Sequence, residues 1–167
     1  GAMDLCRMAS IANGAYDFRF VGAILPEARG LARNHDRIIS FYQKTDEANL
    51  HEHYAWADVF VFPTIEDGYP VVLAQAQSSG LPLLTTANCS GPEFVGAGRM
   101  GGVLPIRDPK SFCSRLEWCD SHRRELVRMI TDIYEHSESL DSALAARNFA
   151  SLCAMKIQEK GAVSRGG

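Results

Sequence analysis

The chain has 167 residues, of which 46% are hydrophobic and 22% are charged. This length allows one domain with a substantial core, and the composition is ordinary for a globular protein. The net charge of −3 argues against a general nucleic-acid-binding surface, and no apolar run approaches the roughly 20 residues needed to span a bilayer. The five cysteines are scattered and lack CxxC spacing, which favours a reduced, cytoplasmic protein without a metal site.

We predict a single domain over residues 4–157. Gly1-Ala2-Met3 is typical of the scar that protease cleavage of an expression tag leaves, and the polar residues 158–167 are expected to form a flexible tail.

Apolar periodicity and turn signals predict helices that alternate with strands. The expected strands cover residues 18–24, 37–42, 58–62, 81–86 and 103–106. The expected helices cover residues 4–12, 26–34, 46–57, 70–79 and 92–95, a long helical region from Asp108, and residues 139–155. This alternation predicts an α/β, Rossmann-like fold, a mainly parallel sheet with helices on both faces. The carboxyl ends of its strands share one edge, where such sheets bind ligands.

An acidic turn follows the buried strand at residues 58–62. Glu66, Asp67 and Gly68 lie in it, and Pro70 opens the next helix. The N–H groups at the start of a helix suit an anion such as a diphosphate, and a carboxylate beside them can accept hydrogen bonds from sugar hydroxyls. The alternative is a solvated turn whose acidic residue only caps the helix.

Two further features lie at the same edge. Gln75, two helical turns beyond Asp67, could bond a ribose, or it could be a half-exposed surface glutamine. Residues 88–93 form a second turn from strand to helix, and its N–H groups could contact a phosphate or a sugar. The alternative for this second turn is a plain helix cap at Ser90.

The residues from His53 to Pro109 resemble the donor-binding half of GT-B-fold retaining glycosyltransferases of the family-1-like group. That group has a tyrosine and an alanine before a DVFV strand, then Pro-Ser/Thr, then two acidic residues with seven residues between them. Asp67 and Gln75 have this separation here, and a Gly-x-Pro-Glu-like turn follows. Ala76, Gly80, Leu81 and Pro82 match the rest of the motif. The resemblance extends from Phe18 to about Arg128.

The resemblance implies metal-independent transfer of a sugar from a UDP- or GDP-sugar, with retained anomeric configuration and no cofactor, in polysaccharide or glycoconjugate synthesis. It implies that Asp67 contacts the sugar, with Glu66 as the alternative, and that Gln75 contacts the ribose. The backbone of Gly68 and Tyr69 would contact the donor, and Tyr42 or Gln43 would border the base. Further donor-binding residues expected at this edge are Thr64, Gly91 and Glu93.

The chain also departs from the family pattern. Both motif glutamates are replaced, by Asp67 and Gln75. The family's first, central strand and its basic loop are not found, which predicts a gap in the sheet or an edge that another chain fills. The acceptor-binding N-terminal half is also missing. We therefore expect no turnover by this chain alone, and any peripheral association with the inner face of a membrane would involve the missing half.

Three other functions are compatible with the fold class to different degrees. A phosphorylase should need a pyridoxal-phosphate lysine, and Lys44, Lys110, Lys156 and Lys160 lie in no such motif. An epimerase on the same fold is a second enzymatic alternative, and a non-catalytic nucleotide-binding or signalling module is a third. A receiver-like module fits poorly because Asp58 lies at the start of a strand. Among other residues, Trp56 and Trp118 are expected in the core or at a domain contact, Arg19 as a solvated charge, and His51 to His53 on a surface helix.

Overall fold

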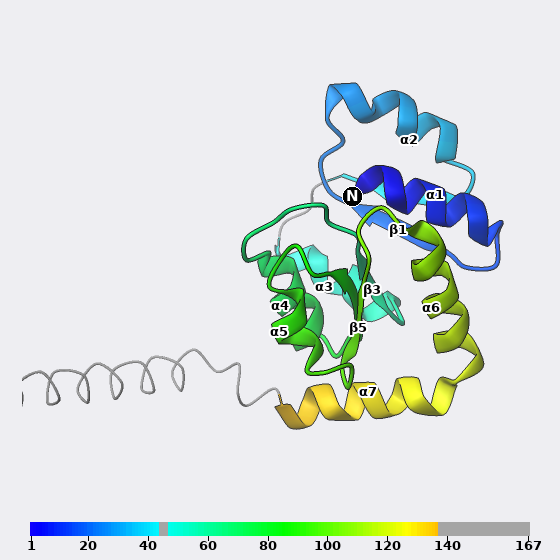
Figure 1. Ribbon diagram of the computed structural model, residues 1–167. Helices are drawn as coiled ribbons and strands as arrows, with labels where there is room; N and C mark the ends of the chain where they lie inside the picture. Colours follow the sequence, from blue (N-terminus) through cyan, green and yellow to red (C-terminus); the bar gives the residue numbers. More distant parts are fainter. Residues whose placement is uncertain (44–46, 137–167) are drawn as a thin grey trace, which may run out of the picture. The chain divides into compact units, whose positions relative to one another are not determined.

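The computed structural model describes residues 1–43 and 47–136, without the side chains of residues 47 and 48. The predicted cap at residues 45–46, the helix at 139–155 and the tail at 158–167 lie outside this part. Residues Gly1–Ile133 form one compact unit, and a second unit begins at Tyr134. The elements in chain order (Figure 1) are α1 (Ala2–Ala12), β1 (Phe18–Val21), η1 (Pro26–Ala28), α2 (Arg29–His35), β2 (Ile39–Tyr42), α3 (Glu47–Trp56), β3 (Phe60–Phe62), α4 (Val71–Ser78), β4 (Leu83–Thr86), α5 (Gly91–Val95), β5 (Gly101–Leu104), α6 (Pro109–Ser121) and α7 (Arg123–His136).

The strands form two separate parallel sheets. β1 pairs with β2, with Phe20 opposite Phe41. β4 lies between β3 and β5, and Phe62 is opposite Thr85. The predicted parallel α/β class is confirmed. No ladder joins β1 to β3 in the described part of the chain, as expected for a sheet that lacks a central strand.

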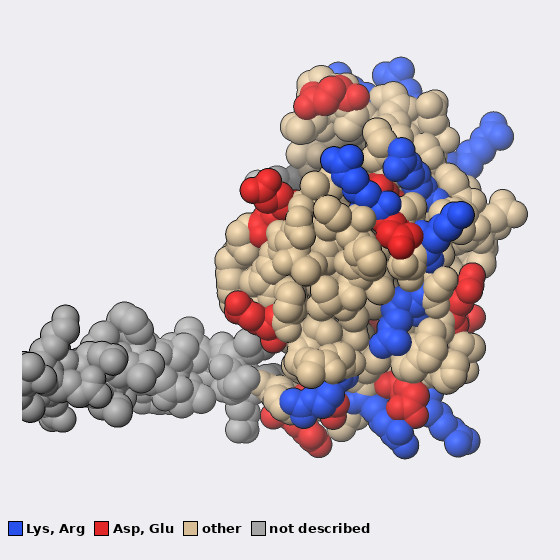
Figure 2. Space-filling view, in the orientation of Figure 1, with Lys and Arg blue, Asp and Glu red and all other residues tan. Residues whose placement is uncertain are grey.

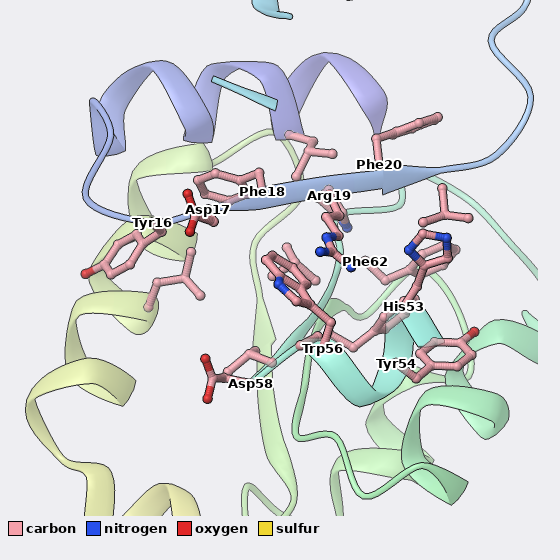
Figure 3. Close-up of a pocket in the computed structure, with 18 of the residues that line it drawn as sticks. Tyr16, Asp17, Phe18, Arg19, Phe20, His53, Tyr54, Trp56, Asp58 and Phe62 are labelled. Atoms are coloured by element: carbon pink, nitrogen blue, oxygen red, sulfur yellow. The ribbon is translucent and has the colours of Figure 1, made fainter. Parts of the chain in front are cut away.

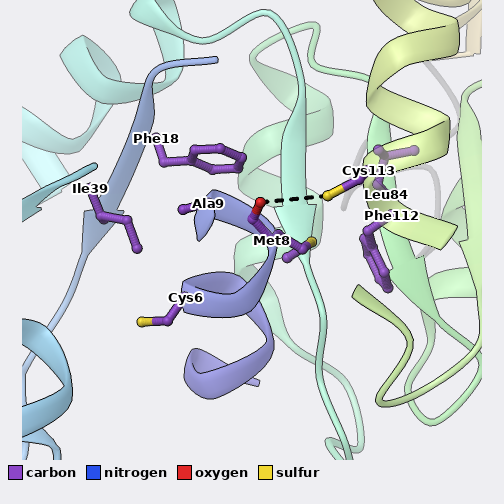
Figure 4. Close-up of a cluster of buried hydrophobic side chains, with 8 residues drawn as sticks. All are labelled: Cys6, Met8, Ala9, Phe18, Ile39, Leu84, Phe112 and Cys113. Carbon is purple, nitrogen blue, oxygen red and sulfur yellow. Dashed lines mark hydrogen bonds between the residues drawn. The ribbon is translucent and has the colours of Figure 1, made fainter. Parts of the chain in front are cut away.

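Helices cover both faces of the sheet formed by β3, β4 and β5. Successive residues of a strand point to opposite faces, so neighbouring residues of β4 enter different hydrophobic clusters. Leu84 of β4 belongs to a cluster with side chains of α1 and α6 and with Phe18 and Ile39 (Figure 4). In that cluster the Cys113 thiol donates a hydrogen bond to the Met8 carbonyl, with an S···O distance of 3.5 Å.

The neighbouring Leu83 belongs to a second cluster, on the opposite face of the sheet. Its other members come from α3, α4, α5 and the approach to β4, and they are Tyr54, Leu73, Ala76, Leu81, Phe94 and Val95. The two clusters confirm that helices pack on both faces of the sheet.

The last strand is shifted from its predicted position. It was expected at residues 103–106, but β5 spans Gly101–Leu104. A Cβ on Gly101 would meet the carbonyl oxygen of Leu83, so only glycine lets the two strands approach this closely. The strand ends before Pro105 because proline has no N–H to donate.

The long helical region predicted from Asp108 is two helices. α6 ends where Ser121 donates its hydroxyl to the Glu117 carbonyl at 2.8 Å, and His122 leaves the helical conformation with φ −120° and ψ 52°. Side-chain bonds to nearby carbonyls compete with the helical pattern at this point. α7 then begins at Arg123.

Charged side chains are unevenly distributed over the face of the molecule that Figure 2 shows. In Figure 2, lysine and arginine side chains gather on the side formed by α6 and α7, while α4 and α5 carry one charged residue between them, Glu93.

Among the described residues, no helix combines the length and hydropathy needed to cross a membrane.

Candidate functional site

Two turns at the carboxyl edge of β3 and β4 are bonded to each other. The N–H of Asp67 donates to the Asn88 carbonyl at 3.0 Å, and the N–H of Ser90 donates to the Gly68 carbonyl at 3.2 Å. The side-chain amide of Asn88 donates to the Ile65 carbonyl at 2.9 Å. The acidic turn is therefore fixed by the next turn along the sheet, although the two are separated by a helix and a strand in the sequence.

A buried hydrogen bond joins the ends of the two strands that lead into these turns. The hydroxyl of Thr86, at the end of β4, donates to the carbonyl of Thr64 at 2.8 Å, and both residues are buried. Thr64 was predicted as a donor-site residue, and its place here is at the base of the acidic turn. Thr86 was not predicted. The sequence feature that could have identified Thr86 is a pair of threonines at the end of a buried apolar strand.

The carboxylates of Glu66 and Asp67 point away from the core. Glu66, Asp67 and Gly68 are all exposed, and α4 has no side-chain cap. No acidic side chain caps the helix, so that part of the alternative is wrong, but the turn is solvated as the alternative predicted. Pro70 occupies the position before the first helical residue instead, with ψ 111°.

Tyr69 lies on the surface beside this turn. Its side chain is 62% exposed, and its ring lies 5.6 Å from the ring of Phe94 in α5. Tyr69 thus links the turn before α4 to α5, and its exposed edge is available to a ligand.

Gln75 lies on the buried side of α4. It is half-buried, and its Oε1 accepts a hydrogen bond of 3.3 Å from the hydroxyl of Tyr54. Burial raises the pKa of Tyr54, so this phenol stays protonated and remains a donor. Among the described residues, the side-chain nitrogen of Gln75 has no partner, which leaves a donor for a ligand hydroxyl.

Gln77, two positions further on, was not predicted. It is buried, and its amide donates to the Phe94 carbonyl at 2.7 Å, which ties α4 to α5. The signal that could have found it is a polar residue in the buried stripe of an otherwise apolar helix.

The second turn differs in detail from its prediction. Gly91 is buried against Thr85, and its N–H donates to the Cys89 sulfur at 3.2 Å, so this N–H is already engaged. Ser90 is the residue before α5, but its buried hydroxyl caps nothing and has no partner among the described residues. Glu93 is exposed on α5.

A group of aromatic and cationic side chains lies at the end of β2. The ring of Tyr42 is 4.6 Å from the ring of His53, and the guanidinium of Arg19 lies 3.8 Å from the ring centre of Trp56 and 5.4 Å from that of Tyr42. Arg19 is therefore held between two rings and is not simply a solvated charge. Trp56 is 41% exposed, so of its two predicted places, the core and a domain contact, the core is wrong and the domain contact stays a prediction. Gln43 is exposed beside this group.

A cavity of about 870 Å³ lies between the two sheets. Figure 3 shows side chains of its lining, among them Phe18 and Arg19 of β1, Trp56 of α3 and Phe62 of β3. The lining includes Thr64 but not Asp67 or Gln75, so these two predicted site residues do not border this cavity. Within the described residues, no three His, Cys, Asp or Glu side chains are grouped in a way that could hold a metal ion.

The fold and this edge define the class of protein: a Rossmann-like α/β half-domain with paired polar turns at the carboxyl ends of neighbouring strands. Residues 3–120 match the family described as glycosyl transferases group 1, and the chain belongs to that family. The predicted resemblance to a family-1-like glycosyltransferase is thereby confirmed.

Relatives and solved structures agree with this assignment. The chain is 32% identical over 130 residues to WcaL of Salmonella typhimurium, a protein named as a colanic acid biosynthesis glycosyltransferase, and the match covers 69% of this chain and 31% of WcaL. The chain thus spans about a third of the length of that relative.

Two solved structures share the fold at low sequence identity. Sucrose-phosphate synthase from Thermosynechococcus elongatus superimposes with a TM-score of 0.75 at 17% identity, over 93% of this chain and 42% of that one. The pneumococcal O-GlcNAc transferase GtfA, solved in complex with UDP and GlcNAc, gives a TM-score of 0.69 at 16% identity, over 89% of this chain and 31% of that one.

Proposed function

We propose that this chain is the donor-binding half of a glycosyltransferase that takes its sugar from a nucleoside-diphosphate sugar. The observation that carries the proposal is the pair of turns bonded to each other at the carboxyl edge, which presents Asp67 beside the start of α4. An acceptor-binding half would precede this one. Membership of the family and the greater length of WcaL support this arrangement.

The start of α4 suits the diphosphate. Pro70 has no N–H, and the N–H of Leu73 donates to the Pro70 carbonyl at 3.0 Å. The N–H groups of Val71 and Val72 therefore have no intrahelical partners, and they carry the partial positive charge of the helix end. Gly68 and Tyr69 add exposed backbone beside them.

The acidic turn suits the sugar. The carboxylate of Asp67, or of Glu66 beside it, can accept hydrogen bonds from two sugar hydroxyls. The free amide nitrogen of Gln75 suits a ribose hydroxyl, and the exposed face of Tyr42 suits the base, with Gln43 next to it. Thr64, Gly91 and Glu93 would shape the walls of this site.

The transfer itself exchanges one bond for another. The bond from the anomeric carbon to the diphosphate oxygen breaks, and the diphosphate leaves with the electron pair. The acceptor hydroxyl oxygen forms the new glycosidic bond and loses its proton, which the departing diphosphate can take up. We propose that the anomeric configuration is retained and that no metal takes part.

Two similar proteins, GtfA and WcaL, indicate which substrates should be tested first. GtfA was solved with UDP, which favours a UDP-sugar over a GDP-sugar as the first donor to test. The naming of WcaL as a colanic acid biosynthesis glycosyltransferase supports a role in polysaccharide synthesis. We propose that the full-length protein acts at the inner face of a membrane.

Thermal unfolding with added donor tests the proposal. UDP-GlcNAc or GDP-mannose at about 100 times its Kd should raise the melting temperature by about 5–10 °C, because a ligand of the native state stabilises it by RT ln(1 + [L]/Kd). Asp67→Asn and Gln75→Leu should each weaken binding, the former by about tenfold or more. Asp36→Asn, an exposed carboxylate at the end of α2, is the matched control and should bind normally.

Two outcomes would contradict the proposal. One is that no nucleotide-sugar stabilises the chain, and the other is that Asp67→Asn binds as tightly as the unchanged chain. Binding of free nucleotide with no gain from the attached sugar would favour the non-catalytic module. We expect no sugar transfer by this chain alone, and steady turnover in a transfer assay would contradict that expectation.

A further inference from the structure

Tyr54 of α3 is bonded to the residue that was predicted to contact the ribose. Its hydroxyl donates to Oε1 of Gln75 in α4 across 3.3 Å. Tyr54 is buried, with 8% of its surface exposed, while Gln75 is half-buried. The bond therefore joins a core side chain to a side chain at the border between core and solvent.

Packing holds the Tyr54 ring in place. The ring lies 5.9 Å from the ring of Phe60 in β3, and Tyr54 belongs to the buried cluster that includes Leu73 and Ala76 of α4. A buried hydroxyl has no water to bond, so its hydrogen needs an acceptor within the fold. Among the described residues that acceptor is Gln75 Oε1, and burial raises the pKa of Tyr54, so the hydroxyl keeps its hydrogen.

This bond selects one of the two orientations of the Gln75 amide. With Oε1 toward the phenol, the hydroxyl hydrogen of Tyr54 is bonded and the NH₂ group lies on the other side of the amide. In the flipped orientation the amide would donate to the phenol oxygen, and the buried hydroxyl hydrogen would lose its acceptor. A buried donor without a partner is costly, so the first orientation is favoured.

The NH₂ group in this orientation is accessible. Nε2 of Gln75 has no partner among the described residues, yet the buried side-chain atoms that lack a partner there are His53 Nδ1 and Ser90 Oγ. Helical side chains tilt toward the N-terminus of their helix, and α4 begins at the carboxyl edge of the sheet. Val71, one turn earlier on the same side of α4, is 62% exposed, so this side of the helix is open to solvent toward that edge.

We propose that Tyr54 is a positioning residue of the donor site, which fixes the Gln75 amide so that its nitrogen donates a hydrogen bond to a ribose hydroxyl of the nucleotide. This inference rests on the proposed function. It gives Gln75 the opposite polarity to the glutamate of the family motif, because a carboxylate only accepts hydrogen bonds and the amide nitrogen only donates them. The ribose oxygen at Gln75 is therefore an acceptor.

Side-chain NMR of the ¹⁵N-labelled chain tests the positioning without any ligand. The order parameter of the Gln75 NH₂ group should exceed about 0.6 in the unchanged chain and fall below it in Tyr54→Phe, because the amide loses the bond that fixes it. Tyr54→Phe keeps the ring that packs against Phe60. Tyr16→Phe removes the hydroxyl of another half-buried tyrosine and is the matched control, which should leave the Gln75 order parameter unchanged.

Calorimetric titration with UDP or GDP, whichever binds more tightly, tests the contact with the ribose. Tyr54→Phe should weaken binding about 3–10-fold. The same substitution in the Gln75→Leu chain should cause no further loss, because both residues act through one contact. In the unchanged chain the nucleotide should also shift an NH₂ hydrogen resonance of Gln75 downfield, since that hydrogen enters a new bond.

Nucleotides that lack one hydroxyl identify the group that Gln75 contacts. Either the 2′-deoxy or the 3′-deoxy form should bind the unchanged chain about 3–10-fold more weakly than the parent nucleotide. The same form should bind Gln75→Leu as tightly as the parent nucleotide does. This comparison within one chain does not depend on how Tyr54→Phe affects folding.

Three results would overturn the proposal. A Gln75 order parameter that Tyr54→Phe leaves unchanged would show that the phenol does not fix the amide. Equal weakening by Tyr54→Phe with and without the Gln75 side chain would assign the effect to packing alone. An unshifted Gln75 NH₂ resonance in the nucleotide-bound chain would show that the nitrogen makes no contact. Absence of any nucleotide binding would overturn the donor site together with this contact, whereas normal binding with any of the three results would overturn this contact alone.

Discussion

At the scale of single residues, burial decides how the thiols react. Cys6, Cys113 and Cys119 are buried, and burial raises the pKa of each thiol, while Cys89 is half-buried in the turn after β4. The thiolate is the reactive form. We therefore expect iodoacetamide at about pH 7.5 to modify Cys89 at least about tenfold faster than the other three, measured by mass spectrometry of peptides.

Unfolding provides the control for this prediction. In concentrated urea the thiols of Cys6, Cys89, Cys113 and Cys119 should react at similar rates, because the difference among these four comes from the fold. Rapid modification of Cys113 in the native chain would contradict the close packing of α6 on α1 that its hydrogen bond to Met8 indicates.

Among single residues, the sequence can point to those whose proposed role follows from their spacing within one stretch of the chain. Asp67 and Gln75 were selected by their spacing, and their role in donor binding stays a prediction. Arg19 between Trp56 and Tyr42 could not be identified, because this contact joins three elements that are distant in sequence. The sequence alone does not distinguish an arginine whose guanidinium lies on an aromatic ring from an arginine that is surrounded by solvent.

At the scale of elements, the start of α6 depends on one carboxylate. Asp108 accepts a hydrogen bond of 2.6 Å from the Ser111 hydroxyl and one of 3.2 Å from the Ser111 N–H, and the bonds lower the pKa of Asp108. Because its pKa is lower in the folded state, the Asp108 carboxylate stabilises the fold at any pH above its ordinary, unfolded pKa. This stabilisation is lost as the pH falls through the lowered pKa of the folded state.

Asp108→Ala should therefore lower the melting temperature at pH 7 by about 2–4 °C. The difference from the unchanged chain should shrink as the pH falls below about 4, where the carboxyl group becomes protonated in both states. Asp36→Ala, an exposed aspartate at the end of α2, is the control and should show a smaller change at pH 7. A difference for Asp108→Ala that stays constant from pH 7 to pH 2 would contradict the role of the charge.

The pair of glycines at the start of β5 gives a sharper test. Gly101→Ala should destabilise the fold by about 2 kcal/mol or more, because its Cβ would meet the Leu83 carbonyl in the neighbouring strand and its φ of 152° is unfavourable for alanine. Gly102→Ala is the matched control, since a Cβ there meets only ordinary contacts at 3.5 Å. Urea unfolding of both variants measures the difference, and equal losses would contradict the close approach of β4 and β5.

This close approach also explains why β5 was predicted two residues too late. Glycines disfavour strands on average, so the predicted strand begins only after Gly101 and Gly102. The strand begins there because the neighbouring backbone leaves no room for a side chain, and a sequence does not contain that distance. The order of helices and strands was predictable because it depends on apolar spacing along the chain.

At the scale of the whole molecule, one hydrophobic cluster connects the two sheets. Phe18 of β1 and Ile39 of β2 share it with Leu84 of β4, through Met8 of α1 and Phe112 of α6 (Figure 4). Since no ladder joins β1 to β3 among the described residues, packing through these helices carries the connection. The gap itself could be predicted from the motif order, but the residues that bridge it could not.

Truncating Met8 should separate the stabilities of the two sheets. Met8 is fully buried, so Met8→Ala should cost about 2–5 kcal/mol, and hydrogen exchange should accelerate in β1 and β2 more than in β4. Leu73→Ala is the matched control, because Leu73 is equally buried but belongs to the cluster on the other face, with α3, α4 and α5. That variant should accelerate exchange first in α4 and β4. If both variants instead accelerate exchange uniformly over all five strands, the two sheets unfold as one unit and the cluster around Met8 has no special role in joining them.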